Sequence, residues 1–167
     1  NILGTHDTPR ILTVLGRKNE PETRDEMARA KLSEGDLFRA IKKLKVAAVL
    51  EYTLYGLPSL YYGDEILTEG EKDPFNRTCF DWDKLNKPCE IFDLYKKLGE
   101  IRAKEAVFKN GETEVVFSKG GAFSFRRYAG DEEIIVVVNA SEYAYTVNSD
   151  KKAVDLLSGE TNKKFTI

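Results

Sequence analysis

The only histidine of this 167-residue chain, His6, is followed directly by Asp7 within residues 3–10 (LGTHDTPR). An apolar run, then a small-residue step, the polar pair and a proline is typical of a strand that ends where a helix begins. In α/β barrels, the C-terminal ends of strands carry the polar side chains that act on a substrate. We therefore interpret His6 and Asp7 as one part of a catalytic cleft, whose other residues come from elsewhere.

Other acidic pairs are expected to be structural. Asp64 and Glu65 are adjacent on an extended segment, so their side chains point to opposite faces. Asp81 and Asp83 lack the glycine and the closing glutamate that a calcium loop requires at fixed offsets. One histidine and two cysteines without CxxC spacing argue against a zinc site. The sequence therefore assigns no metal and no cofactor.

The composition is that of a globular protein, with 41% hydrophobic and 32% charged residues. The net charge is −2 and both signs are interspersed, which argues against a nucleic-acid-binding surface. No apolar segment approaches the ~20 residues of a membrane-spanning helix, and no signal peptide is recognised at the N-terminus. Cys79 and Cys89 are expected to be free thiols, with a single disulfide as the alternative. The sequence assigns no cellular compartment, with the cytoplasm slightly favoured.

Helical and strand patterns alternate in the first part of the chain. Residues 37–52 repeat apolar side chains at helical spacing, with Asp36 as the expected cap. A short, largely apolar strand is predicted at residues 59–62, and a second long helix at residues 91–101. Residues 17–34 are charged and form either a surface excursion or a solvated helix. A helix followed by a strand across a short turn is one step of a doubly wound or barrel fold.

After about residue 104 the pattern changes to short β-type runs with close turns. Gly120-Gly121 and Gly130-Asp131 supply two of these turns. Six short strands predict a small antiparallel sandwich and a domain boundary near residue 105. They are expected at residues 113–118, 122–128, 133–139, 143–147, 153–157 and 163–167.

Three passages, in their order and spacing, make the chain resemble the C-terminal portion of α-amylase superfamily glycoside hydrolases. Within that superfamily they are most similar to the branch of neopullulanase, cyclomaltodextrinase and maltogenic amylase. The passages are residues 3–10, residues 56–65 (GLPSLYYGDE), and residues 73–77 (DPFNR) followed by 81–83 (DWD).

The resemblance implies a fold. Residues 1–104 would be the last part of a catalytic (β/α)8 TIM barrel, running from the end of strand seven to helix eight. Residues 2–3 would end the seventh strand, and residues 60–62 would form the eighth. Residues 105–167 would form a C-terminal antiparallel β-sandwich domain.

The resemblance also implies roles for four residues. Asp7 matches the family's aspartate that binds sugar hydroxyls and stabilises the transition state, and His6 matches a histidine that hydrogen-bonds a neighbouring hydroxyl. Asp73 and Arg77 match a loop that contacts sugars further from the scissile bond. A charged acceptor on hydroxyls that polarise in the transition state gives differential stabilisation.

Several further positions bear on this site. Thr5 stands where the wider superfamily usually has asparagine, and this branch prefers a small residue there. Trp82 either stacks on a sugar or fills the gap beneath its loop. Four tyrosines are expected to pack in the core, namely Tyr52, Tyr55, Tyr61 and Tyr62.

A retaining glycosidase needs a carboxylate nucleophile and a second carboxyl as general acid and base, about 5 to 5.5 Å apart. In this family both come from the fourth and fifth barrel strands, which would precede Asn1, so we expect the isolated chain to be inactive. The parent would cleave α-1,4-glucosidic bonds in cyclodextrin, pullulan or maltooligosaccharides, without nucleic-acid or membrane partners, and is compatible with a homodimer. Two alternatives stay open: a non-catalytic barrel that binds sugar or serves as a scaffold, and a freestanding carbohydrate-binding sandwich.

Overall fold

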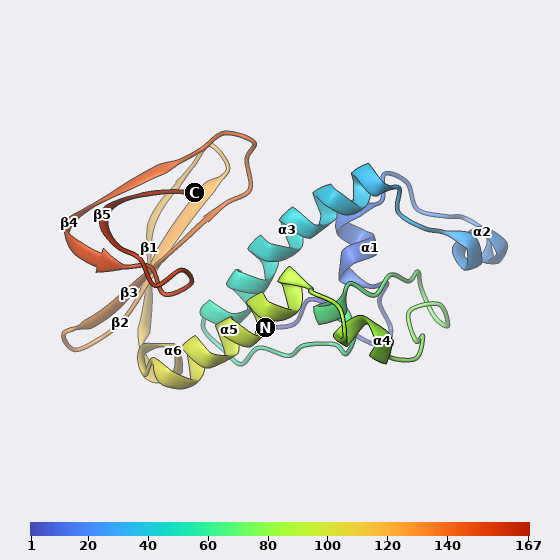
Figure 1. Ribbon diagram of the computed structural model, residues 1–167, viewed down its shortest axis with the longest axis horizontal. Helices are drawn as coiled ribbons and strands as arrows, with labels where there is room; N and C mark the ends of the chain where they lie inside the picture. The colour runs from blue at the N-terminus through green and yellow to red at the C-terminus, as the bar shows by residue number, and fades with distance from the viewer. The chain divides into compact units, whose positions relative to one another are not determined.

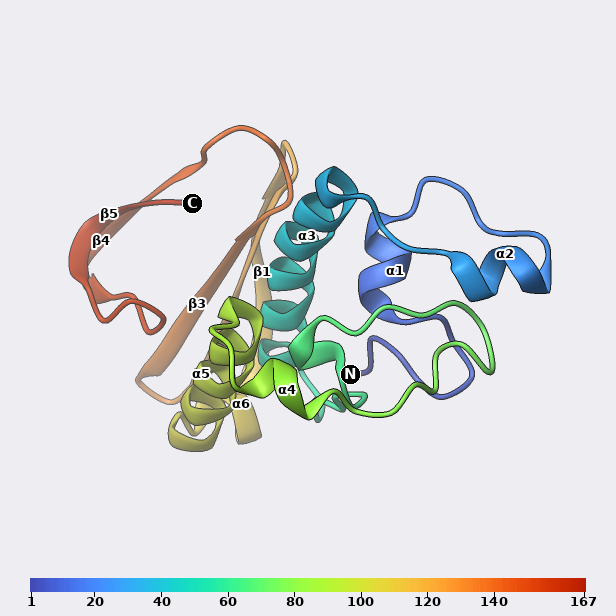
Figure 2. The same cartoon turned by 45° about the vertical axis from the view of Figure 1, so that its right-hand side comes forward.

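The computed structural model describes residues 1–167, which divide into two compact units. Unit 1 contains residues 1–51 and 57–96, and unit 2 contains residues 52–56 and 97–167. Figures 1 and 2 show that unit 1 is built mainly from helices and that the strands belong to unit 2. No helix in the chain is long and apolar enough to cross a membrane.

Unit 1 is organised around one long helix, α3. This helix spans Glu34–Thr53 and buries Ala40, Leu44 and Ala48 completely, at the four-residue spacing of a single helix face. The other elements of the unit are α1 (Ile11–Gly16), α2 (Arg24–Arg29), the short 3-10 helix η1 (Asp64–Ile66), α4 (Trp82–Leu85) and the first part of α5 (Glu90–Lys104).

The start of α3 differs from the prediction. The helix begins at Glu34, before Asp36, which was the expected cap. Ser33 caps it instead, because its hydroxyl oxygen accepts the backbone N–H of Asp36 at 3.2 Å. The Ser33 hydroxyl in turn donates to the Asp36 carboxylate at 2.6 Å, and this bond lowers the pKa of Asp36.

Strand pairing in unit 1 is limited to one parallel bridge, between Ile2 and Ser59. The backbone N–H of Ser59 donates to the carbonyl of Asn1 at 2.8 Å. Of the strand predicted at residues 59–62, only Ser59 pairs, and residues 60–62 form no strand, because an apolar run becomes a strand only where a neighbouring strand continues the ladder. The parallel direction of the bridge is the direction that consecutive barrel strands take.

Unit 2 contains two antiparallel sheets, as the prediction of an antiparallel sandwich required. The first sheet joins β1 (Glu112–Lys119), β2 (Ala122–Ala129) and β3 (Glu132–Asn139) in that order. The second sheet pairs β4 (Thr146–Val154) with β5 (Thr161–Thr166), and the short helix α6 (Val107–Asn110) precedes β1.

Five strands form where six were predicted. Parts of the expected strands 143–147 and 153–157 belong to the single strand β4. The polar residues 149–152 (SDKK) do not break this strand, because a register shift between Asn148 and Ala153 absorbs them in the pairing with β5.

The core of unit 2 contains a buried arginine. Phe125, Val136 and Val107 are buried apolar residues of this core. Arg127, which lies on β2, is completely buried as well. Its guanidinium donates to backbone carbonyls, including that of Gly111 at 2.9 Å.

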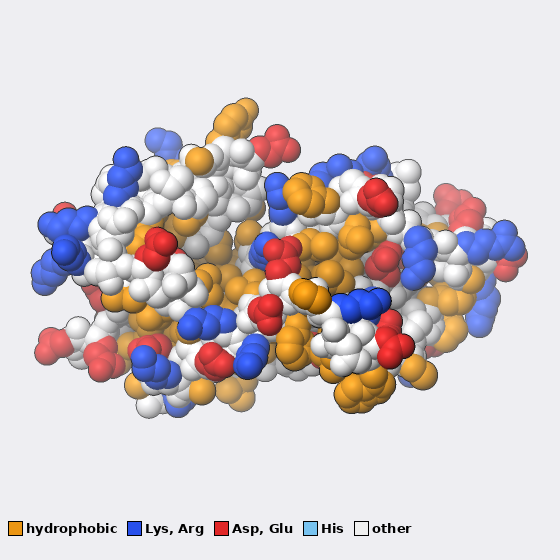
Figure 3. Space-filling view, in the orientation of Figure 1, with side chains coloured by type: hydrophobic (Ala, Val, Ile, Leu, Met, Phe, Trp, Pro, Cys, Tyr) orange, Lys and Arg blue, Asp and Glu red, His pale blue; other side chains and the backbone are white.

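On the surface, basic and acidic side chains are interspersed over the face shown in Figure 3, in keeping with the small net charge.

Candidate functional site

His6 and Asp7 lie on an exposed turn that is hydrogen-bonded within itself. Thr8 Oγ1 accepts the N–H of Thr5 at 2.9 Å, and Thr5 Oγ1 accepts the N–H of Asp7 at 3.1 Å. His6 Nε2 lies 3.1 Å from Asp7 Oδ2, and the two side chains are 64% and 70% exposed. The turn therefore presents an imidazole and a carboxylate together to solvent.

The loop at residues 73–77 brings the other two predicted residues to the same place. The guanidinium of Arg77 lies 3.6 Å from Asp7 Oδ1, and its Nε lies 2.5 Å from Asp73 Oδ1. All four predicted site residues thus form one cluster, in the order His6, Asp7, Arg77 and Asp73. Exposed ion pairs contribute only about 0 to 1 kcal/mol. These side chains can therefore give up their contacts with one another and bind the hydroxyls of a ligand at little cost in free energy.

Asn76 is a residue of this region that the sequence interpretation missed. Its side chain is completely buried, and Nδ2 donates to the carbonyls of His6 and Thr8, each at 2.7 Å. An asparagine two residues after a proline indicates a turn. The local sequence does not show whether such an asparagine is exposed in the turn or is buried and hydrogen-bonded to a distant segment.

Arg10 is a second buried anchor behind the turn. Its guanidinium donates to the carbonyl of Tyr62 and lies 3.4 Å from Asp64 Oδ1. The guanidinium carbon also lies 4.2 Å from the ring centre of Tyr61, within cation–π range. Burial raises the pKa of Asp64 to about 7, and the charge of Arg10 opposes this rise. These contacts tie the segment after Asp7 to residues 61–64. Asp64 and Glu65 lie in the 3-10 helix η1 and not on the extended segment that was predicted, and Asp64 is buried against Arg10.

Several aromatic side chains differ in their exposure from the expectation. Trp82 is 72% exposed, with its ring 4.8 Å from that of Phe80, so it does not fill a gap beneath its loop. Tyr55 is 74% exposed and Tyr62 is 39% exposed, so the prediction that they pack in the core is wrong. Local sequence cannot distinguish an aromatic side chain on the core face from one at the rim, because burial depends on what packs over it.

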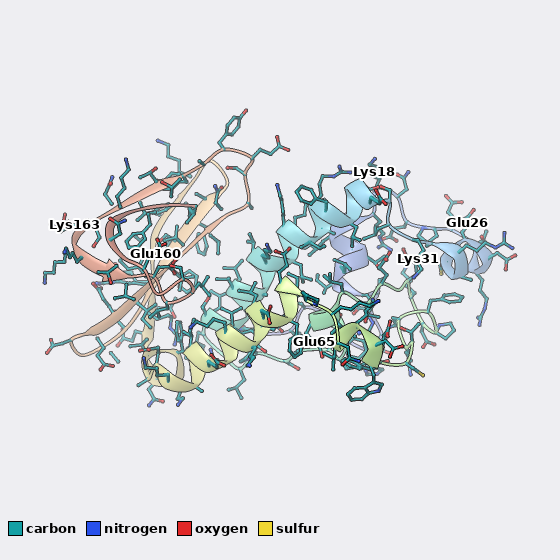
Figure 4. All side chains as sticks on the ribbon, viewed as in Figure 1. Lys18, Glu26, Lys31, Glu65, Glu160 and Lys163 are labelled. Carbon is teal, nitrogen blue, oxygen red and sulfur yellow. The ribbon has the colours of Figure 1, made fainter.

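Titratable side chains elsewhere do not extend this cluster. Cys79 and Cys89 are free thiols, and no group of three or more potential metal ligands forms. A cavity of about 310 Å³ in unit 1 contains none of the four predicted site residues. The residues around this cavity include three that Figure 4 labels: Glu26 on α2, Lys31 shortly after it, and Lys18 beside the start of α3.

Comparison with known proteins gives the chain a set of relatives. No protein-family model matches it. An amylopullulanase from Thermoanaerobacter thermohydrosulfuricus is 39% identical over 127 residues, which are 76% of this chain and 8% of that protein. A cyclomaltodextrinase from Thermoanaerobacter pseudethanolicus is 32% identical over 164 residues, which are 98% of this chain and 23% of that protein. The chain thus spans less than a quarter of the length of either relative.

Solved structures give the same picture. The crystal structure of maltogenic amylase from S. marinus matches with a TM-score of 0.72 and 30% identity, over 97% of this chain and 20% of that one. An α-amylase from Geobacillus thermoleovorans matches in fold, with a TM-score of 0.75 and 21% identity, over 99% of this chain and 36% of that one. The two antiparallel sheets of unit 2 match the C-terminal domain of these enzymes. The predicted resemblance is therefore confirmed: this chain is a homologue of α-amylase family enzymes, among them amylopullulanase, cyclomaltodextrinase, maltogenic amylase and neopullulanase.

Proposed function

We propose that this chain is the C-terminal part of an α-glucan hydrolase that cleaves α-1,4-glucosidic bonds by a retaining mechanism. Cyclodextrin, pullulan and maltooligosaccharides are the proposed substrates, and the names of the relatives support that class. One observation carries the proposal: Arg77 contacts both Asp7 and Asp73, so motif residues from two distant segments form one exposed cluster.

We also propose the division of the chain between two domains. Residues 1–104 would form the last part of a (β/α)8 barrel, and residues 105–167 the C-terminal sandwich. The parallel bridge between Ile2 and Ser59 supports this, because helix α3 lies between the two segments in sequence as a barrel helix lies between consecutive strands.

In the proposed mechanism, Asp7 binds the sugar ring next to the scissile bond. Its carboxylate accepts hydroxyl protons of that ring, and these bonds strengthen as the ring distorts toward an oxocarbenium ion. His6 bonds a neighbouring hydroxyl, and Asp73 with Arg77 bind the hydroxyls of a sugar further from the cut. A planar guanidinium flanked by carboxylates offers donors and acceptors together, which suits vicinal hydroxyls.

The nucleophile and the general acid of this mechanism would come from the fourth and fifth barrel strands. Both strands would precede Asn1 in the parent protein. We therefore propose that residues 1–167 alone do not hydrolyse glucans and need no cofactor to bind one.

The proposal is tested by Asp7→Ala in the complete enzyme that contains this chain, assayed on a cyclodextrin. Transition-state contacts to hydroxyls contribute several kcal/mol, so kcat should fall by roughly a thousandfold while KM changes less. Asp131→Ala, in the exposed turn between β2 and β3, is the control and should leave both constants unchanged. An Asp7→Ala enzyme with near-normal kcat would overturn the assignment.

A further inference from the structure

We propose that Asn76 is a positioning residue, whose side-chain amide holds the Asp7 carboxylate in its sugar-binding orientation. The inference rests on the role proposed above for Asp7. It adds a residue that touches no substrate and acts through the backbone of the turn. The sequence places Asn76 in the same loop as Asp73 and Arg77, directly before the arginine.

The side-chain amide of Asn76 is hydrogen-bonded to the turn on both sides of Asp7, and we call this pair of hydrogen bonds the clamp. One nitrogen, Asn76 Nδ2, donates both of its protons, to the carbonyl before Asp7 and to the carbonyl after it, at 2.7 Å each. Because both partners are carbonyl oxygens, only the NH2 end of the amide can face them. The residues that supply the carbonyls are His6 and Thr8.

Burial makes this clamp the strongest link between loop and turn. Asn76 is completely buried, and a hydrogen bond removed from water is electrostatically stronger than one at the surface. The other direct link, from Arg77 to Asp7, is exposed and contributes about 0 to 1 kcal/mol. Asn76 Oδ1 has no hydrogen-bond partner. The two hydrogen bonds that Nδ2 donates are therefore the interactions that require an amide side chain at this position.

The clamp also couples the two halves of the cluster. The backbone of Asn76 runs directly into Arg77, so any shift of the loop moves the guanidinium and releases the turn together. A displacement of about 1 Å at a reacting centre can cost about a hundredfold in rate. Loss of the Asn76 donor should therefore lower kcat more than it weakens ground-state binding.

The first test uses the complete enzyme that contains this chain, in which the imidazole NMR signal of His6 is identified by its absence from His6→Gln and reports on the turn. Asn76→Asp keeps the shape but removes both donors, and Asn76→Ser keeps one donor. The matched control is Asn139→Ala in unit 2, because Asn139 Nδ2 also donates to two carbonyls, those of Tyr143 and Ile167.

We expect the imidazole signal of His6 to shift or split in Asn76→Asp, to change less in Asn76→Ser, and to stay unchanged in Asn139→Ala. An unchanged His6 signal in folded Asn76→Asp would overturn the inference. If Asn76→Asp does not fold, the same comparison is made with Asn76→Ser, and an unchanged signal there overturns the inference as well.

The second test measures kinetics in the complete enzyme. Asn76→Asp should lower kcat by about 10- to 100-fold with a smaller change in KM, and Asn76→Ser should recover part of the loss. If Asp7→Ala abolishes activity and Asn76→Asp leaves kcat unchanged, the positioning role fails while the proposed function stands. If Asp7→Ala leaves kcat normal, the proposed function fails, and the His6 signal still decides whether Asn76 holds the turn.

Discussion

Arg127 holds a buried positive charge in unit 2, and the groups that accept its hydrogen bonds are backbone carbonyls. Its guanidinium donates to the carbonyls of Thr53 at 3.0 Å, Val107 at 3.0 Å, Gly111 at 2.9 Å and Glu112 at 3.3 Å. Burial lowers the pKa of Arg127 below its ordinary value, and the nearby positive charge of Arg102 adds to the effect. A guanidinium nevertheless stays protonated in proteins, so the buried group is charged.

Replacing this side chain by methionine keeps most of its volume and removes every donor. The three shortest bonds join the charged guanidinium to buried carbonyls, and a hydrogen bond to a charged group contributes about 1.5 to 3 kcal/mol. Relief from burying a charge offsets part of the sum. We therefore expect Arg127→Met to lower the free energy of unfolding by about 3 to 5 kcal/mol.

The neighbouring residue provides the matched control. Arg126 lies on the same strand but is 39% exposed, with its guanidinium 2.7 Å from Glu114 and 3.5 Å from Glu133. Such exposed pairs contribute about 0 to 1 kcal/mol, so Arg126→Met should lose no more than that. Urea denaturation followed by circular dichroism compares the two variants. Equal losses would refute the claim that the buried carbonyl contacts stabilise unit 2.

Two further predictions concern unit 1. Burial raises the pKa of Glu51 from 4.5 to about 7, so the folded chain binds this proton more tightly and stability falls as pH rises from about 4.5 to 7. Glu51→Gln should remove about 3 kcal/mol of that fall in urea denaturation at pH 5 and 8, and an unchanged pH dependence would contradict it. Gly63 has φ of 90°, and a Cβ there would lie 2.6 Å from Thr68 Oγ1, so Gly63→Ala should cost about 2 kcal/mol or more. Gly130→Ala, at φ of 59° with no atom within 4 Å, should cost only about 1 kcal/mol, and equal thermal melts for the two variants would show that the contact is relieved freely.

Local patterns were sufficient for much of the fold. Helix α3 was predictable because apolar residues recur at helical spacing from Leu37 to Tyr52, and strands β1 to β3 were predictable because glycine turns separate them. The continuation of the predicted strand over residues 60–62 and the break within β4 were predicted wrongly. In both cases the outcome depends on whether a partner strand is present, and that information is not local.

The candidate site shows the same division. The motifs identified His6, Asp7, Asp73 and Arg77, and the structure places their side chains together. Asn76 was missed because its partners lie 70 and 68 residues away in sequence, so no periodicity or spacing encodes its burial.

The most direct test of the central claim is the coding sequence upstream of Asn1. If this chain belongs to an active α-glucan hydrolase, that sequence encodes the rest of a barrel, with an aspartate at the end of strand four and a glutamate at the end of strand five. A barrel without those two carboxyls, or a start codon immediately before Asn1, would contradict the claim. Asp7 would then bind or support a sugar without taking part in its cleavage.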